Sequence, residues 1–154
     1  FDSMEALGLV LIDESFRTLR DMLRGARAGK LDPTRVIDSS VDILITGVNE
    51  RREHWRFVAR ERNSGVTVLR YAIRTEIRLI TSESAIDLAR FPGLRSWSGE
   101  DLNTLASLIV NAMISIAEAL DDATDDAAID EIRRIAVKQL KMIIIGVANW
   151  RSDH

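Results

Sequence analysis

The feature that most limits the fold of this chain is a pair of consecutive helical segments that are apolar on nearly every side. Residues 102–120, and the second half of residues 127–150, place apolar side chains all around a helix axis instead of along one stripe. A single domain of 154 residues has room for about one helix that is covered on all sides. We therefore expect these two helices to pack one face on their own domain and the other on a second copy. A monomer in which both helices are central is the alternative.

The dimer prediction assigns an interface to the apolar residues of these last two helices. A homodimer interface of this kind resembles a domain core cut in half, so the expected contacts are large aliphatic and aromatic side chains. The predicted interface residues are Leu105, Ile109, Ile114, Ile116, Leu120, Leu140, Ile143, Ile144, Val147 and Trp150.

The rest of the chain is predicted to be helical as well, because its apolar residues recur at helical spacing between only two prolines and eight glycines. We expect helices over residues 2–28, 33–49, 50–63 and 66–90, with Asp32 and Ser98 as N-caps of the second and fifth helices. Pro33 suits a first helical turn, and Pro92 ends the fourth helix. The predicted fold is all-α: one domain, residues 1–154, forming a bundle of about six helices.

The composition of the chain excludes several classes of function. The chain contains no cysteine, which excludes disulfides, thiolate metal sites and thiol catalysis. Its net charge of −3, with both signs mixed throughout, argues against a nucleic-acid-binding surface on this domain. No signal-peptide pattern opens the sequence, and the apolar stretch 102–117 is too short and too often interrupted by polar residues to span a bilayer. We expect a cytoplasmic protein with no membrane contact.

Catalytic and metal sites are not indicated. His54 and His154 have no ligand spacing, and the acidic residues 121–126 lack the pattern of a calcium loop, so we expect a solvated turn there. No phosphate-binding loop or nucleophile elbow is present. Three glutamates are candidates for general acid–base chemistry, but nothing in the sequence pairs them: Glu14, Glu61 and Glu118. We expect no enzyme activity, no cofactor and no metal.

Five sequence strings resemble one known family. They are MEALGLVLIDE at residues 4–14, WRFVARERNSG at 55–65, RTEIR at 74–78, AEALD at 117–121 and QLKMIIIGVANW at 139–150. In this order they resemble the body of tetracycline-repressor (TetR) family regulators, and within that family the repressors of unsaturated fatty-acid synthesis. The first string resembles the helix that links the DNA-binding head to the body.

The resemblance implies a function and a partner for the body and for the DNA-binding head. In that family the body dimerises through its last two helices, as a four-helix interface, and takes long-chain acyl groups, often as coenzyme A thioesters, between its helices. The bound ligand shifts the spacing of two N-terminal helix-turn-helix heads on operator DNA. That head is absent from this chain, so we expect operator binding only through it, in an intact protein.

An acyl pocket needs apolar walls with few polar groups, and the third to fifth predicted helices supply both. The candidate ligand-binding residues are Phe57, Val58, Arg60, Glu61, Ile73, Ile77, Ile80, Ile109, Asn111 and Met113. The cluster Arg60-Glu61-Arg62, with Arg56 one turn earlier, offers guanidinium groups for a carboxylate or phosphate, or ordinary ion pairs. In the alternative interpretation, the apolar candidates are ordinary core residues. The alternative function is an all-α carrier or interaction module for an apolar ligand without a link to DNA; a helical enzyme is a third reading.

Overall fold

The computed structural model describes residues 3–28, 33–63 and 65–152, and 86% of the chain is helical. Six α-helices follow one another, with one short 3-10 helix, η1, between the fourth and fifth. Their bounds are α1 Met4–Ala28, α2 Pro33–Glu50, α3 Arg52–Glu61, α4 Thr67–Leu88, η1 Pro92–Leu94, α5 Gly99–Asp122 and α6 Asp126–Asn149. The prediction of an all-α bundle of about six helices is confirmed.

Helix ends follow the local sequence signals. Ser98 caps α5, and its Oγ accepts a hydrogen bond from the Asp101 amide at 3.1 Å. Pro33 is the first residue of α2, whereas the predicted cap Asp32 lies outside the described residues. Phe91 has an extended backbone before Pro92, because proline disfavours the helical conformation of the residue before it. The chain therefore leaves α4 at Leu88, close to the predicted end.

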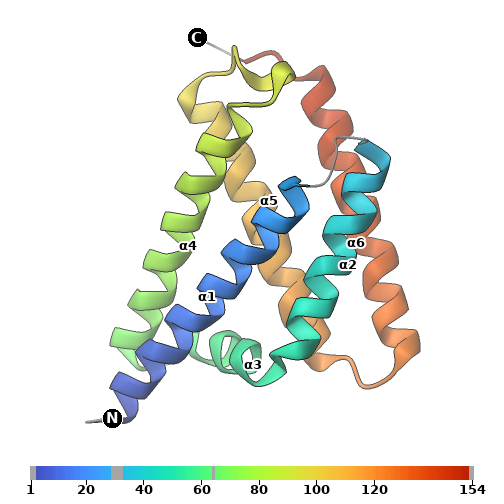
Figure 1. Cartoon of the computed structure of the whole chain (residues 1–154). Coiled ribbons are helices and arrows are strands. Elements are labelled where there is room, and N and C mark those ends of the chain that lie inside the picture. Colours follow the sequence, from blue (N-terminus) through green and yellow to red (C-terminus); the bar gives the residue numbers. More distant parts are fainter. Residues whose placement is uncertain (1–2, 29–32, 64, 153–154) are drawn as a thin grey trace.

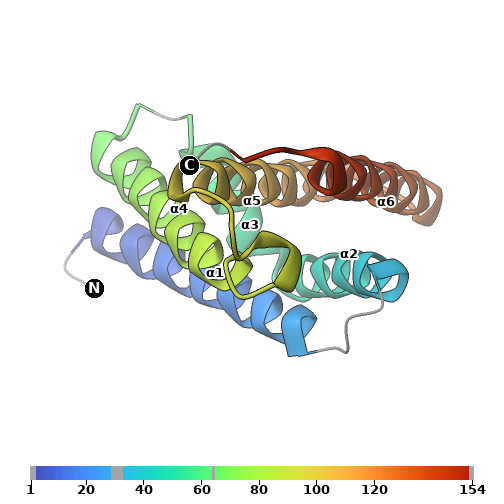
Figure 2. The same cartoon turned by 90° about the horizontal axis from the view of Figure 1, so that it is seen from above.

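The helices form a bundle in which α2, α3 and α5 each pack against four others. Helix α5 packs against α2, α3, α4 and α6, and α1 packs against α2, α3 and α4 (Figure 1). Seen from above, α5 and α6 lie side by side along one side of the molecule, and α1 and α2 lie along the opposite side (Figure 2). Within the described part of the chain, no helix covers the outer side of α5 and α6.

Most of the core lies between α1, α2, α4 and α5. Phe16 on α1 and Leu120 on α5 are fully buried in it, and Phe16 meets Trp55 of α3 edge to face with 6.3 Å between ring centroids. Gly8 lets α1 approach α4 closely, since a Cβ there would lie 2.8 Å from Leu69 Cδ2. A second, smaller cluster of buried residues, Leu94, Leu102 and Leu105, lies where η1 meets the start of α5.

Two ion pairs connect α1 to α4. The guanidinium group of Arg20 donates to Glu76 Oε2 at 2.9 Å and to Glu83 Oε2 at 3.0 Å. Burial alone would lower the pKa of Arg20, but the hydrogen bonds and charges of the two glutamates outweigh it and raise that pKa above its usual value. Arg20 therefore stays charged and holds the two helices together.

Asp125 is the N-cap of α6, and it supplies the first stability prediction. Its Oδ1 accepts a hydrogen bond from the Ala128 amide at 2.8 Å, which satisfies a backbone donor that the first helical turn leaves without a partner. We expect Asp125→Ala to lower the free energy of unfolding by about 1 kcal/mol, measured by urea denaturation. Asp122→Ala, on an exposed acid three residues earlier, is the control. Equal losses in the two variants would contradict the capping role.

Candidate functional site

The outer side of α5 and α6 carries large apolar side chains that the described chain leaves uncovered. We call this surface the outer face, and its residues are Leu108, Ile135, Met142, Ile145 and Trp150, which are 38% to 68% exposed. An apolar pocket of about 390 Å³ opens between the two helices at the same place. Its lining residues include Trp97, Leu105, Leu108, Met142, Ile143, Val147 and Trp150. Leu108, Met142 and Trp150 line this pocket together, and exposed apolar surface gathered in this way marks a binding or association site.

Beside this pocket, hydrogen bonds connect the start of α5 with the residues that follow α6. Trp150 Nε1 donates to Asp101 Oδ2 at 3.1 Å, and Ser152 Oγ donates to the same carboxylate oxygen at 2.6 Å. The Ser152 hydroxyl also accepts a hydrogen bond from the Ser98 amide at 2.8 Å. The segment after α6 is therefore held to the first turn of α5, which keeps the two helices at a defined separation.

The predicted interface residues divide into three groups. Four of them are buried within a single chain, because Leu105, Ile114, Ile116 and Leu120 are at most 7% exposed. Helix α5 packs against four helices of its own domain and these side chains fill that core, so their part in a dimer interface stays a prediction. Half-buried positions against the core clusters are Ile109, Leu140, Ile143 and Val147.

The third group is exposed. Trp150 belongs to the outer face and Ile144 is 40% exposed, but Ile144 points about 100° away from Ile145 around the helix axis. The prediction did not include Leu108, Ile135, Met142 and Ile145, the main residues of the outer face. The sequence held no signal for them, because residues 142–147 are apolar on every side of the helix and no polar stripe marks the exposed side.

A second pocket, which we call the arginine pocket, lies where α3 leads into α4. It has a volume of about 300 Å³ and is lined by Arg62, Asn63, Arg70, Ile73, Arg74 and Ile77. The two isoleucines form its apolar part, since Ile73 is 1% exposed in the core and Ile77 packs against the same core. The three arginines give it a positive charge. An apolar wall beside several cationic groups suits an amphiphilic anion.

Most of the predicted ligand residues belong to the filled core. Ile73 and Ile77 line the arginine pocket, whereas Val58 and Ile80 are at most 2% exposed within the core. The remaining apolar candidates, Phe57, Ile109 and Met113, are half-buried and pack against the two core clusters.

The polar candidates lie apart from the arginine pocket's lining. Arg60 is exposed, lies 5.6 Å over the Phe57 ring and donates to Glu61 Oε1 at 3.3 Å. Asn111 is exposed on α5 and donates to Ser107 Oγ at 3.2 Å. Helical spacing places it one turn beyond Leu108, on the side of α5 that faces away from the core, and its role in ligand binding stays a prediction.

Helix α3 is held against the C-terminal end of α5 by three arginines, which we call the arginine clamp. Arg52 Nη2 donates to the carbonyl oxygens of Leu120 and Ala123 at 3.2 and 3.3 Å. Arg56 Nε donates to Asp121 Oδ1 at 3.1 Å, and Arg62 Nη1 donates to Glu118 Oε1 at 2.8 Å. A helix C-terminus carries partial negative charge and unsatisfied carbonyl groups, and Glu118 and Asp121 add to that charge.

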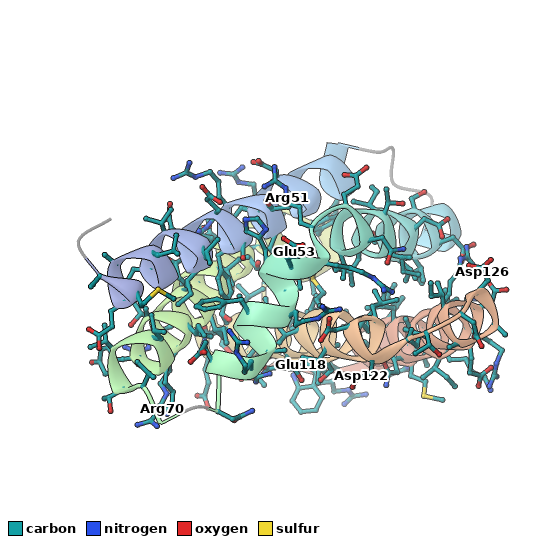
Figure 3. The ribbon with its side chains drawn as sticks, turned by 90° about the horizontal axis from the view of Figure 1, so that it is seen from below. Arg51, Glu53, Arg70, Glu118, Asp122 and Asp126 are labelled. Atoms are coloured by element: carbon teal, nitrogen blue, oxygen red, sulfur yellow. The ribbon has the colours of Figure 1, made fainter. Side chains whose placement is uncertain are left out.

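The arginine clamp gives a structural role to acidic residues that the sequence predicted to lie in a solvated turn. Figure 3 shows α3 lying across this end of the bundle, with Glu118 and Asp122 of α5 beside it. Asp121 and Asp125 are not merely solvated, as predicted for residues 121–126, because Asp121 pairs with Arg56 and Asp125 caps α6. Sequence spacing puts Arg52 and Arg56 on one side of a helix, but it does not reveal which helix they contact.

Helix α5 is long and apolar enough, by length and composition alone, to cross a membrane, with a mean hydropathy of 1.4 in its most apolar window. In this structure its buried residues belong to both core clusters, and Thr104, Asn111 and Ser115 lie exposed at helical spacing. Core helices of globular domains meet the same length criterion. The prediction of no membrane contact stays a prediction.

A comparison of the sequence with models of known protein families finds no match.

Proposed function

We propose that this chain is the ligand-sensing and dimerisation domain of a TetR-like transcriptional repressor that responds to fatty acyl ligands. In this proposal, operator DNA is bound by a helix-turn-helix head of the intact protein, and the domain works in the cytoplasm without a cofactor and without catalysing a reaction. The observation that carries the proposal is the uncovered apolar outer face of α5 and α6.

The outer face supports association of two copies. Five large apolar side chains are exposed on two neighbouring helices, and the apolar pocket between those helices continues the same surface. Covering such a surface contributes about 25 cal/mol for each Å² of apolar area removed from water. A second copy offers the same face, so a two-fold arrangement of the α5–α6 pair buries both faces in a four-helix interface.

The arginine pocket supports a ligand with an apolar chain. Its floor, Ile73 and Ile77, is continuous with the main core, where Phe57 and Met113 are only half-buried. A methionine side chain adapts readily to irregular shapes, so the core between α3, α4 and α5 has the means to repack around an acyl chain. The five strings that resemble fatty-acid repressors agree with this choice of ligand.

Native mass spectrometry tests the proposal, with the chain measured alone and after addition of oleoyl-coenzyme A. We expect a dimer of the 17.3 kDa chain that gains one acyl ligand for each copy. Decanol and free coenzyme A are the matched controls, and they separate recognition of the chain from recognition of the head group. A dimer that binds none of these compounds would reduce the proposal to a dimerisation domain, and a monomer that binds oleoyl-coenzyme A would favour a carrier module.

A further inference from the structure

We infer that the arginine pocket binds the anionic head group of an amphiphile, a phosphate or a carboxylate, and that Arg62 leaves Glu118 to contact the bound anion. The inference rests on the proposed function for the apolar chain of the ligand, but the anion site itself follows from the pocket. Charge, donor geometry and the position of Arg62 in the arginine clamp each support it.

The charge of the pocket is strongly one-sided. Its six lining side chains include three arginines and no acid. Arg62 is paired with Glu118, an acid of α5 that does not line the pocket. Arg74 is exposed at the pocket edge, and none of the residues three or four positions from it on α4, at 70, 71, 77 and 78, is an acid. The lining therefore offers an anion guanidinium groups and no carboxylate.

The donors are arranged for an oxyanion. Arg70 and Arg74 are four residues apart on α4, so their side chains extend from the same face of the helix. A guanidinium group presents paired N–H donors that match two oxygens of a carboxylate or phosphate. Asn63 adds an amide donor from the segment after α3. Figure 3 shows Arg70 and Glu118 at the same end of the bundle.

The apolar floor selects an amphiphile over a small free anion. Ile73 and Ile77 line the same pocket as Arg70 and Arg74 and belong to the same helix, and Ile73 is part of the main core. The volume of about 300 Å³ is at the lower end of the range for small-molecule sites, roughly 300–1,000 Å³. The head group therefore has room at the mouth while the first carbons of a chain contact the isoleucines.

Arg62 couples the pocket to α5. It lines the pocket and is also one of three arginines that hold α3 to the end of α5. A bound anion competes with Glu118 for its guanidinium group, so occupancy of the pocket weakens the arginine clamp. The coupling is reciprocal, and loss of the Glu118 charge is expected to strengthen anion binding.

Isothermal titration with dodecyl phosphate, dodecanoate, dodecanol and inorganic phosphate tests the inference on the whole chain. We expect both anionic amphiphiles to bind at least about tenfold more tightly than dodecanol, the size of effect that a charge-assisted hydrogen bond gives. Arg74→Gln should weaken the anionic amphiphiles about tenfold and leave dodecanol unchanged. Arg78→Gln, on an exposed arginine one turn further along α4 and outside the pocket, should change neither. Glu118→Gln should strengthen the anionic amphiphiles several-fold without affecting dodecanol.

Three outcomes would overturn the inference: equal binding of dodecanol and dodecyl phosphate, equal losses in Arg74→Gln and Arg78→Gln, or no gain in Glu118→Gln. Binding of inorganic phosphate as tight as that of dodecyl phosphate would refute the amphiphile and leave a simple anion site. These results are separable from the proposed function. A dimer that binds dodecyl phosphate, dodecanoate and dodecanol equally tightly refutes only the inference. A monomer with an Arg74-dependent anion site refutes only the proposed function.

Discussion

If two copies associate through the outer face as proposed, replacing Met142 and Ile145 together by glutamate is expected to give a monomer. Both side chains lie on the outer face, one helical turn apart on α6, and are 68% and 64% exposed in a single chain. Their substitution therefore removes little from the core of the domain. In the proposed interface each glutamate is placed against apolar side chains of the partner and loses the water that solvates a carboxylate.

The expected effect is large because every substitution occurs twice around the two-fold axis. A charge buried against apolar side chains costs at least about 3 kcal/mol, so even one such charge on each copy weakens the dimer roughly ten-thousandfold. Size-exclusion chromatography with light scattering measures the mass. Tyr71→Glu is the control, since Tyr71 is 62% exposed on α4 and does not belong to the outer face. A double variant that stays dimeric, or a control that also dissociates, would refute the outer face as the interface.

Phe16→Ala is expected to lower the free energy of unfolding by about 3–5 kcal/mol. Phe16 is fully buried, and its ring meets Trp55 edge to face, so the substitution leaves a cavity where α1 packs against α3. The loss consists of the transfer free energy of the ring, the aromatic contact and the cost of a cavity that the helices fill only in part.

Urea denaturation, followed by circular dichroism and tryptophan fluorescence at one chain concentration, measures this loss. Tyr71→Ala is the matched control, because it removes an exposed aromatic ring and should change stability by less than about 0.5 kcal/mol. Denaturation midpoints that coincide for Phe16→Ala and Tyr71→Ala would show that α1 and α3 do not share the packed core described above.

The helices were predictable from the sequence because helical periodicity and end signals are local. Ser98, Pro33 and Pro92 each act within one turn of their own position, and all three lie where the prediction put them. The side of α5 that faces its own domain was not predictable. A helix that is apolar all round has no polar stripe to mark its orientation, so Leu120 and Leu108 look alike in sequence although one is core and the other exposed.

The candidate sites were predictable only in part. The cluster Arg60-Glu61-Arg62 drew attention to the right segment, but the arginine pocket uses Arg62 with Arg70 and Arg74. These residues come from two helices joined by a turn, and the angle of that turn decides which arginines converge. The apolar candidates Val58 and Ile80 proved to be core because a single sequence does not distinguish a filled core from a wall of a pocket.

The mass of the unmodified chain in solution tests the central claim most directly. Sedimentation velocity over the micromolar range should give a particle of twice 17.3 kDa, because two copies cover the outer faces of α5 and α6. A particle of 17.3 kDa at the same concentrations would contradict the claim and leave the outer face free for a different kind of partner.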